Sequence, residues 1–64
     1  MLVIKRAPKG TVVYETADCK TPLITLDEKK AVSGNEPFEG EAIFVTVGKA
    51  LITGYIPRRV WERM

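Results

Sequence analysis

The sequence predicts an all-β fold, a small five-stranded barrel that ends in one short helical turn. Short runs rich in β-branched and aromatic residues recur along the chain, and Gly, Pro and Asn separate them. No segment shows a sustained helical period. The chain has 64 residues, too few for a β-sandwich, so a single small barrel over residues 1–64 fits best.

The beginning of the chain predicts two strands joined by a tight turn. Residues 2–7 form an apolar run that ends at Pro8-Lys9-Gly10, a strong turn signal. Residues 11–16 are β-branched and aromatic and alternate between two faces, with Tyr14 beside Val12 on one of them. We therefore expect a strand on each side of the turn.

The middle of the chain is less regular. Residues 23–26 form a short apolar strand after a polar loop. Residues 27–41 combine charges with Ser33-Gly34-Asn35 and Pro37, which predicts a long irregular connection with at most a brief strand at 30–32.

The last third predicts a hairpin and a helical turn. Two β-branched runs, 42–47 and 50–56, flank Gly48-Lys49, which is typical of a type II′ turn with Gly48 at positive φ. Pro57 cannot donate to a sheet ladder, so we expect the second strand to stop before it. Residues 57–64 then have room for one or two helical turns with Pro at the first position.

The composition excludes several kinds of chemistry. The chain has no histidine and a single cysteine, Cys19, so an intrachain disulfide and a Cys-His nucleophile cannot form, and a zinc site is excluded. The glycines do not have phosphate-loop spacing. We expect no catalytic residues, no metal and no cofactor.

Charge and hydropathy bear on the partner and the compartment. The formal net charge is +2, too small to indicate a nucleic-acid binder by itself. No apolar run is long enough to cross a bilayer, and no signal-peptide pattern follows Met1. These features predict a cytoplasmic protein that does not bind a membrane.

Two groups of basic residues are candidate binding residues. Arg58, Arg59 and Arg63 lie within six positions and alternate with Val60 and Trp61. A second group contains Lys5, Arg6 and Lys9. The first strand and the last turn of such a barrel lie near each other, so we expect one merged patch. In that patch the arginines would form bidentate hydrogen bonds with phosphate or carboxylate groups, and Trp61 would stack on a base. The alternative is that Arg58, Arg59 and Arg63 form a solvated face and that Trp61 closes the open end of the barrel.

Aromatic residues give a second candidate surface. Tyr55 and Trp61 belong, with arginine, to the types enriched at interface hot spots, and Tyr14 could join them. Trp61 lies three residues from the last one, so we expect it to lie flat across the barrel end with one face exposed. The alternative is that these aromatic side chains simply pack in the core.

Thr53-Gly54-Tyr55-Ile56-Pro57 resembles the closing strand and following turn of SH3 domains. The wider stretch 13–61 looks like a bacterial SH3 domain, which implies an SH3-like five-stranded barrel. The chain departs from the peptide-binding members, which have a tyrosine where Val60 stands and a tryptophan in the strand that here carries Phe44. These departures argue against binding of proline-rich ligands.

A second resemblance concerns only the ends of the chain. Met-Leu-Val-Ile-Lys-Arg at the start and Val-Trp-Glu-Arg-Met at the end look like the ends of carbon-storage-regulator RNA-binding proteins. The Gly-x-x-Ala-Pro segment of that family is absent from the middle of the chain.

These features together predict a non-enzymatic protein-interaction module, an adaptor or inhibitor. The alternative is a small nucleic-acid-binding barrel for RNA or DNA, and the thin core of so short a chain adds a third option, a self-associating homo-oligomer. The predicted binding residues are Lys5, Arg6, Tyr55, Pro57, Arg58, Arg59, Trp61 and Arg63.

Overall fold

The computed structural model of the chain describes residues 1–49 and 52–64. The fold is mostly β, as predicted: one antiparallel sheet of six strands is followed by a short helix. The elements in chain order are β1 (Leu2–Ala7), β2 (Val12–Tyr14), β3 (Pro22–Thr25), β4 (Lys30–Asn35), β5 (Ala42–Val47), β6 (Ile52–Pro57) and α1 (Arg58–Glu62). No helix in the described part of the chain could reach across a bilayer.

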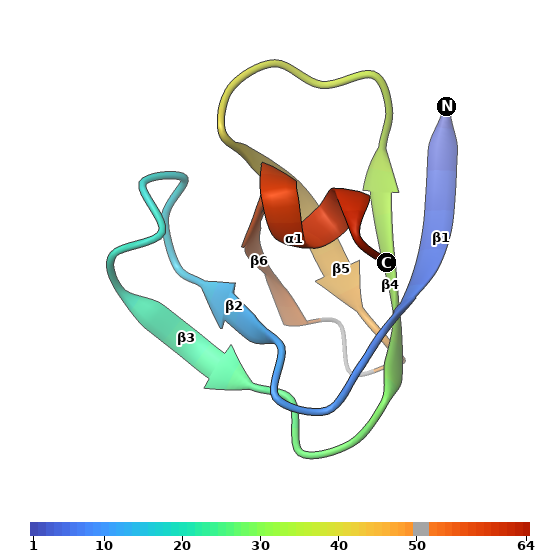
Figure 1. The fold of residues 1–64 in the computed structure, drawn as a ribbon, viewed down its shortest axis with the longest axis vertical. Helices are drawn as coiled ribbons and strands as arrows, with labels where there is room; N and C mark the ends of the chain where they lie inside the picture. The colour runs from blue at the N-terminus through green and yellow to red at the C-terminus, as the bar shows by residue number, and fades with distance from the viewer. Residues whose placement is uncertain (50–51) are drawn as a thin grey trace.

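The sheet is curved and open. Its strand order is β1-β4-β5-β6-β2-β3, so β1 and β3 are its two edges. The sheet curves around α1, which lies against its concave side (Figure 1). The sheet does not close into a barrel, and the predicted count of five strands is not confirmed, because six strands form. The described residues make no ladder between the two edge strands.

The extra strand is β4, which lies in the segment expected to be irregular. It pairs with β1 on one side and with β5 on the other, so its polar composition does not keep it out of the sheet. Val32 and Gly34 alternate inward and are buried. A Cβ at Gly34 would lie 2.7 Å from Ile43 Cδ1, so a glycine there allows the two strands to pack closely.

The core lies between the concave face of the sheet and α1. Aliphatic side chains from the strands surround a single large aromatic one, Trp61, which contributes the largest buried side chain. The buried hydrophobic residues of the described chain are Ala7, Val13, Leu26, Val32, Ile43, Val45, Val47, Ile56 and Trp61.

The hairpin between β5 and β6 differs from the prediction in its turn. Val47 pairs with Ile52, so four residues, 48–51, connect the paired positions instead of two. The two-residue type II′ turn is therefore wrong, although Gly48 does have a positive φ of 53°. Residues 50–51 lie outside the described part. Strand β6 also includes Pro57, which pairs with Ala42, and α1 begins one residue later than expected.

Gly54 is the position where a side chain would most disturb the sheet. A Cβ there would lie 2.5 Å from Val13 Cγ1 and 2.7 Å from the main-chain oxygen of Tyr14. Both atoms belong to β2, so Gly54→Ala must push β2 away from β6. We expect a loss of about 1–3 kcal/mol in the free energy of unfolding, measured by urea denaturation.

Gly48→Ala is the matched control, because no atom lies within 4 Å of a Cβ there and only the positive φ opposes it. That change should cost about 1 kcal/mol. Equal or smaller destabilisation by Gly54→Ala would show that the close approach of β2 to β6 does not constrain the fold.

Candidate binding surfaces

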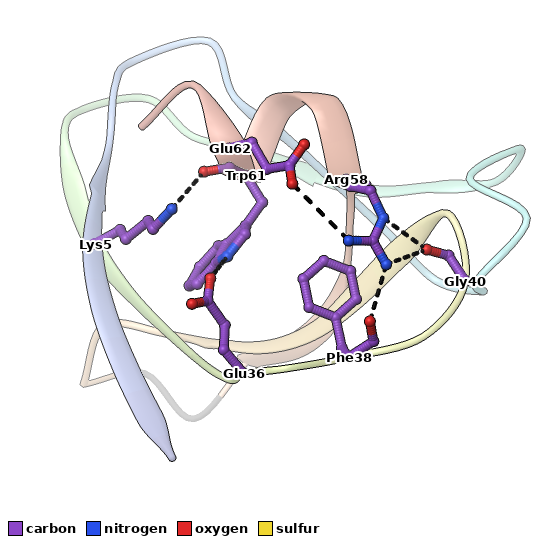
Figure 2. A network of polar contacts seen from close by, with 7 residues as sticks. All are labelled: Lys5, Glu36, Phe38, Gly40, Arg58, Trp61 and Glu62. Atoms are coloured by element: carbon purple, nitrogen blue, oxygen red, sulfur yellow. Dashed lines mark hydrogen bonds and ion pairs between the residues drawn. The ribbon is translucent and has the colours of Figure 1, made fainter.

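Trp61 fixes α1 to the rest of the molecule. Its side chain is fully buried, and its indole Nε1 donates a hydrogen bond to the carboxylate of Glu36 (Figure 2). Lys5 Nζ donates to the main-chain oxygen of Trp61 over 3.0 Å and lies 4.7 Å from the centroid of the ring. A helix of five residues has little stability of its own, so these contacts hold it in place.

The expectation that one face of Trp61 is exposed is therefore wrong. Helix α1 turns back over the concave face of the sheet, and Val60 and Met64 on either side also pack against the core. A chain this small gains much of its buried apolar area from one indole ring. Trp61 thus cannot supply a surface for stacking or docking in this structure.

Arg58 is engaged within the molecule. Its Nε and Nη2 donate to the main-chain oxygen of Gly40 over 2.9 and 2.8 Å, and Nη2 also donates to that of Phe38 over 2.9 Å. The guanidinium carbon lies 4.1 Å from the centroid of the Phe38 ring, and Nη1 is 3.9 Å from Glu62 Oε2 (Figure 2). This side chain fixes the connection between β4 and β5 to α1.

Lys5 and Arg6 lie on opposite faces of β1. Alternation along the strand turns Lys5 toward α1, where it is half-buried, and leaves Arg6 exposed on the other side of the sheet. The two predicted basic groups therefore merge only in part: Lys9 borders the same hollow as Arg59, whereas Arg6 lies on the other face of the sheet. Lys5 does reach the C-terminal helix, as expected from the closeness of the two chain ends, but it binds a main-chain oxygen there.

The remaining basic side chains lie along a shallow hollow between β2, the turn at 8–11 and the start of α1. The side chains of Lys9, Arg59 and Arg63 are exposed, and none of them makes a hydrogen bond or ion pair with another described residue. The hollow has a volume of about 370 Å³, and a smaller one of about 190 Å³ continues it past Arg63. We call it the basic trough, and its lining includes Pro8, Lys9, Val12, Tyr14, Pro57, Arg59, Val60, Arg63 and Met64.

The convex side of the sheet carries an aromatic row. Tyr55 stands opposite Phe44 of β5 and opposite Tyr14 of β2, so the three side chains share a face. The rings of Phe44 and Tyr55 meet edge to face, with centroids 5.4 Å apart and planes at 65°. Phe44 is 53% exposed, and the two tyrosines are half-buried. Tyr14 also borders the basic trough.

This face has little charge. We call the outward positions of β1, β2, β4, β5 and β6 the convex face. Arg6 at its β1 edge is the one charged residue among these strand positions, and Lys49 borders the face beside Ile4 and Thr46. Two exposed aliphatic side chains, Leu2 and Ile4, lie at the same edge. The convex face comprises Leu2, Ile4, Arg6, Val12, Tyr14, Ala31, Ser33, Asn35, Ala42, Phe44, Thr46, Thr53, Tyr55 and Pro57.

The sequence reasoning missed the largest exposed side chains of this face. Phe44 could have been found, because Ile43, Val45 and Val47 alternate inward and so place Phe44 outward. Leu2 and Ile4 gave no such signal, since an aliphatic run at 2–7 is equally typical of a buried strand.

Cys19 lies in the loop between β2 and β3 with a positive φ of 55°. Burial raises the pKa of its thiol, and the negative charge of Asp18 adds to this effect, while Arg59 opposes it. A raised pKa makes the thiolate scarcer at neutral pH, the reverse of what an activated nucleophile needs. Within residues 1–49 and 52–64, no three His, Cys, Asp or Glu side chains gather as metal ligands would.

The burial of Trp61 predicts a large effect of its removal. Trp61→Ala should lower the free energy of unfolding by about 3–5 kcal/mol, because it empties the centre of the core and leaves the Glu36 carboxylate without its donor. Phe44→Ala, at an exposed aromatic position, should change stability by about 0.5 kcal/mol or less. Acrylamide quenching of the native protein should be weak. Strong quenching, or similar losses for the two variants, would contradict the buried position.

Two adjacent arginines predict opposite outcomes. Arg58→Ala removes the hydrogen-bond donors to the main-chain oxygens of Phe38 and Gly40. It should lower the free energy of unfolding by about 1–2 kcal/mol, because the guanidinium is partly exposed and water competes for the same hydrogen bonds. Arg59→Ala, the matched control of equal charge change, should have an effect of about 0.5 kcal/mol or less. Equal effects in urea denaturation would mean that Arg58 acts only through its charge.

No protein-family model, curated protein or solved structure matches this chain, so the resemblance to SH3 domains remains a prediction.

Proposed function

We propose that this chain is a non-enzymatic protein-interaction module that binds an apolar surface of a partner protein on its convex face. The observation that carries the proposal is the aromatic row of Tyr14, Tyr55 and Phe44 on a sheet face with a single charged residue at its edge. This revises the surface predicted from the sequence: Tyr55 and Tyr14 are kept, Trp61 and Arg58 are left out, and Phe44 is added.

The composition of the convex face supports this proposal. The solvent side of an antiparallel sheet normally alternates polar and charged residues against the buried side. Here the outward positions hold small, hydroxyl-bearing, aliphatic and aromatic side chains. Depletion of charge together with enrichment in Tyr and Phe is characteristic of the central part of protein–protein interfaces. Phe44, more than half exposed beside a tyrosine ring, is the expected anchor.

The nucleic-acid alternative has less support. Of the basic residues that predicted it, Lys5 and Arg58 bind main-chain oxygens, and Trp61 is buried and cannot stack on a base. The basic trough retains three exposed cations, with Tyr14 as the aromatic side chain at its border. Such a surface supports a weak, salt-dependent attraction to phosphate groups, with little contribution from stacking on bases.

A site-directed crosslinking experiment tests the proposal. A diazirine photo-crosslinker at position 46 samples the convex face, and the same group at position 63 samples the basic trough. In the native host, we expect crosslinks to a protein from position 46. The affinity of that purified protein should fall about 30-fold for Phe44→Ala, the effect of losing an interface anchor worth about 2 kcal/mol. It should change less than about threefold for the joint replacement of Arg59 and Arg63 by Ala.

The opposite pattern would overturn the proposal. It would consist of crosslinks to RNA or DNA from position 63 and none to protein from position 46. Binding of a single-stranded oligonucleotide would then weaken steeply with salt. The joint arginine replacement would reduce the slope of log affinity against log salt concentration by about 1.4, which is about 0.7 for each arginine.

A further inference from the structure

Strand β1 has one unpaired side. It pairs with β4 only, and no other strand lies beyond it in the described structure (Figure 1). A free strand edge presents N–H and C=O groups that can pair with another chain. Which groups face outward follows from the pairing with β4.

The hydrogen bonds at the start of β1 set its register. The amino group of Met1 donates to the main-chain oxygen of Glu36, and the Glu36 N–H donates back to the oxygen of Met1, both over 2.9 Å. In an antiparallel ladder such doubly bonded pairs alternate with unbonded ones. Val3, Lys5 and Ala7 therefore bond to β4, whereas the N–H and C=O groups of residues 2, 4 and 6 point away from the sheet.

The two sheet edges are not equally protected. Strand β3 has four residues, begins with Pro22, which has no N–H to donate, and has an irregular register with β2. Strand β1 has six residues, no proline and no irregularity in its register with β4. Its exposed side chains include two aliphatic ones, Leu2 at 60% and Ile4 at 66% exposure. Long apolar edges of this kind are normally covered or interrupted.

We propose that β1 pairs antiparallel with β1 of a second copy of this chain, about a two-fold axis at Ile4. Residues 2, 4 and 6 are symmetric about that position, so Leu2 would face Arg6 of the second copy and Ile4 would face its own equivalent. Each of these three pairs would exchange two main-chain hydrogen bonds, which leaves none of the outward groups unpaired. The symmetric contact closes on itself and yields a dimer instead of a fibre.

The charges of the strand fit this register. Arg6 stands opposite an aliphatic side chain of the second copy, and Lys5, which already binds Trp61, stands opposite Val3 on the concave side. No two like charges face each other directly, an arrangement that would destabilise the pair. The Leu2 and Ile4 side chains of both copies would meet on the convex side and cover one another.

The pairing lies on the same convex face as the partner protein proposed above, but it uses a different part of that face. It uses Leu2, Ile4 and Arg6 at the β1 edge, whereas the aromatic row lies on β5, β6 and β2. Phe44→Ala should therefore leave the dimer intact, so the failure of one proposal does not entail the failure of the other.

Sedimentation equilibrium with charge variants tests the dimer. The weight-average mass of the native chain should rise from 7.1 kDa toward twice that value as the concentration increases. Ile4→Lys and Ile4→Glu, each alone, should raise the dissociation constant at least about tenfold, because like charges then face each other across the axis. An equimolar mixture of the two variants should recover association. Thr53→Lys carries the same added charge on the convex face away from β1 and should behave like the native chain.

Hydrogen exchange gives a second readout that does not depend on a substitution. The amides of Ile4 and Arg6 should become more protected as the concentration rises, and those of Lys5 and Ala7 should stay protected throughout. The proposal is overturned if the native chain stays monomeric at millimolar concentration. It is also overturned if the mixed variants fail to associate or if Thr53→Lys weakens the dimer equally.

Discussion

The packing of Trp61 against the concave side of the sheet is the interaction on which the rest of the structure depends. An open sheet needs something to cover its apolar face, and here one indole ring at the end of a five-residue helix does so. Its contacts connect distant parts of the chain, since Lys5 comes from the first strand and Glu36 from the connection after β4. Without the ring, the second layer would keep only the smaller contacts of Val60 and Met64.

The same packing divides the cations by role. Lys5 and Arg58 hold Trp61 and the 38–40 segment in place through main-chain oxygens, while Arg59 and Arg63 remain in solvent. Arg58 and Arg59 are neighbours in the sequence, but Arg58 stabilises the fold whereas the side chain of Arg59 is exposed to solvent. The molecule keeps a modest positive charge, but the face with the most interface-like composition carries little of it, which is why we propose protein binding.

Much of the fold follows from local patterns, and the remainder depends on long-range pairing. The mostly β character, the strand at residues 2–7 and the positive φ of Gly48 were predictable from β-branched runs and turn residues. Of strand β4 only residues 30–32 were expected as a brief strand, because Ser33 and Asn35 resemble a loop until neighbours on both sides bond their backbone. The burial of Trp61 was named only as the alternative to an exposed ring, since nothing local determines whether a terminal helix projects outward or folds back over the sheet. Tyr55 shares a face with Tyr14, which was named as its possible neighbour, whereas Phe44 was not identified.

The strand order has a consequence for how the chain acquires its structure. Strands β4, β5 and β6 follow one another as hairpins, whereas the first strand must find a partner near the middle of the chain and β2 must find β6. A meander of these three strands has little stability by itself. Its apolar face remains exposed to water until the distant strands and the final helix pack against it. Intermediates that lack those segments are therefore poorly stabilised, and the molecule should order as one cooperative unit despite its local hairpins.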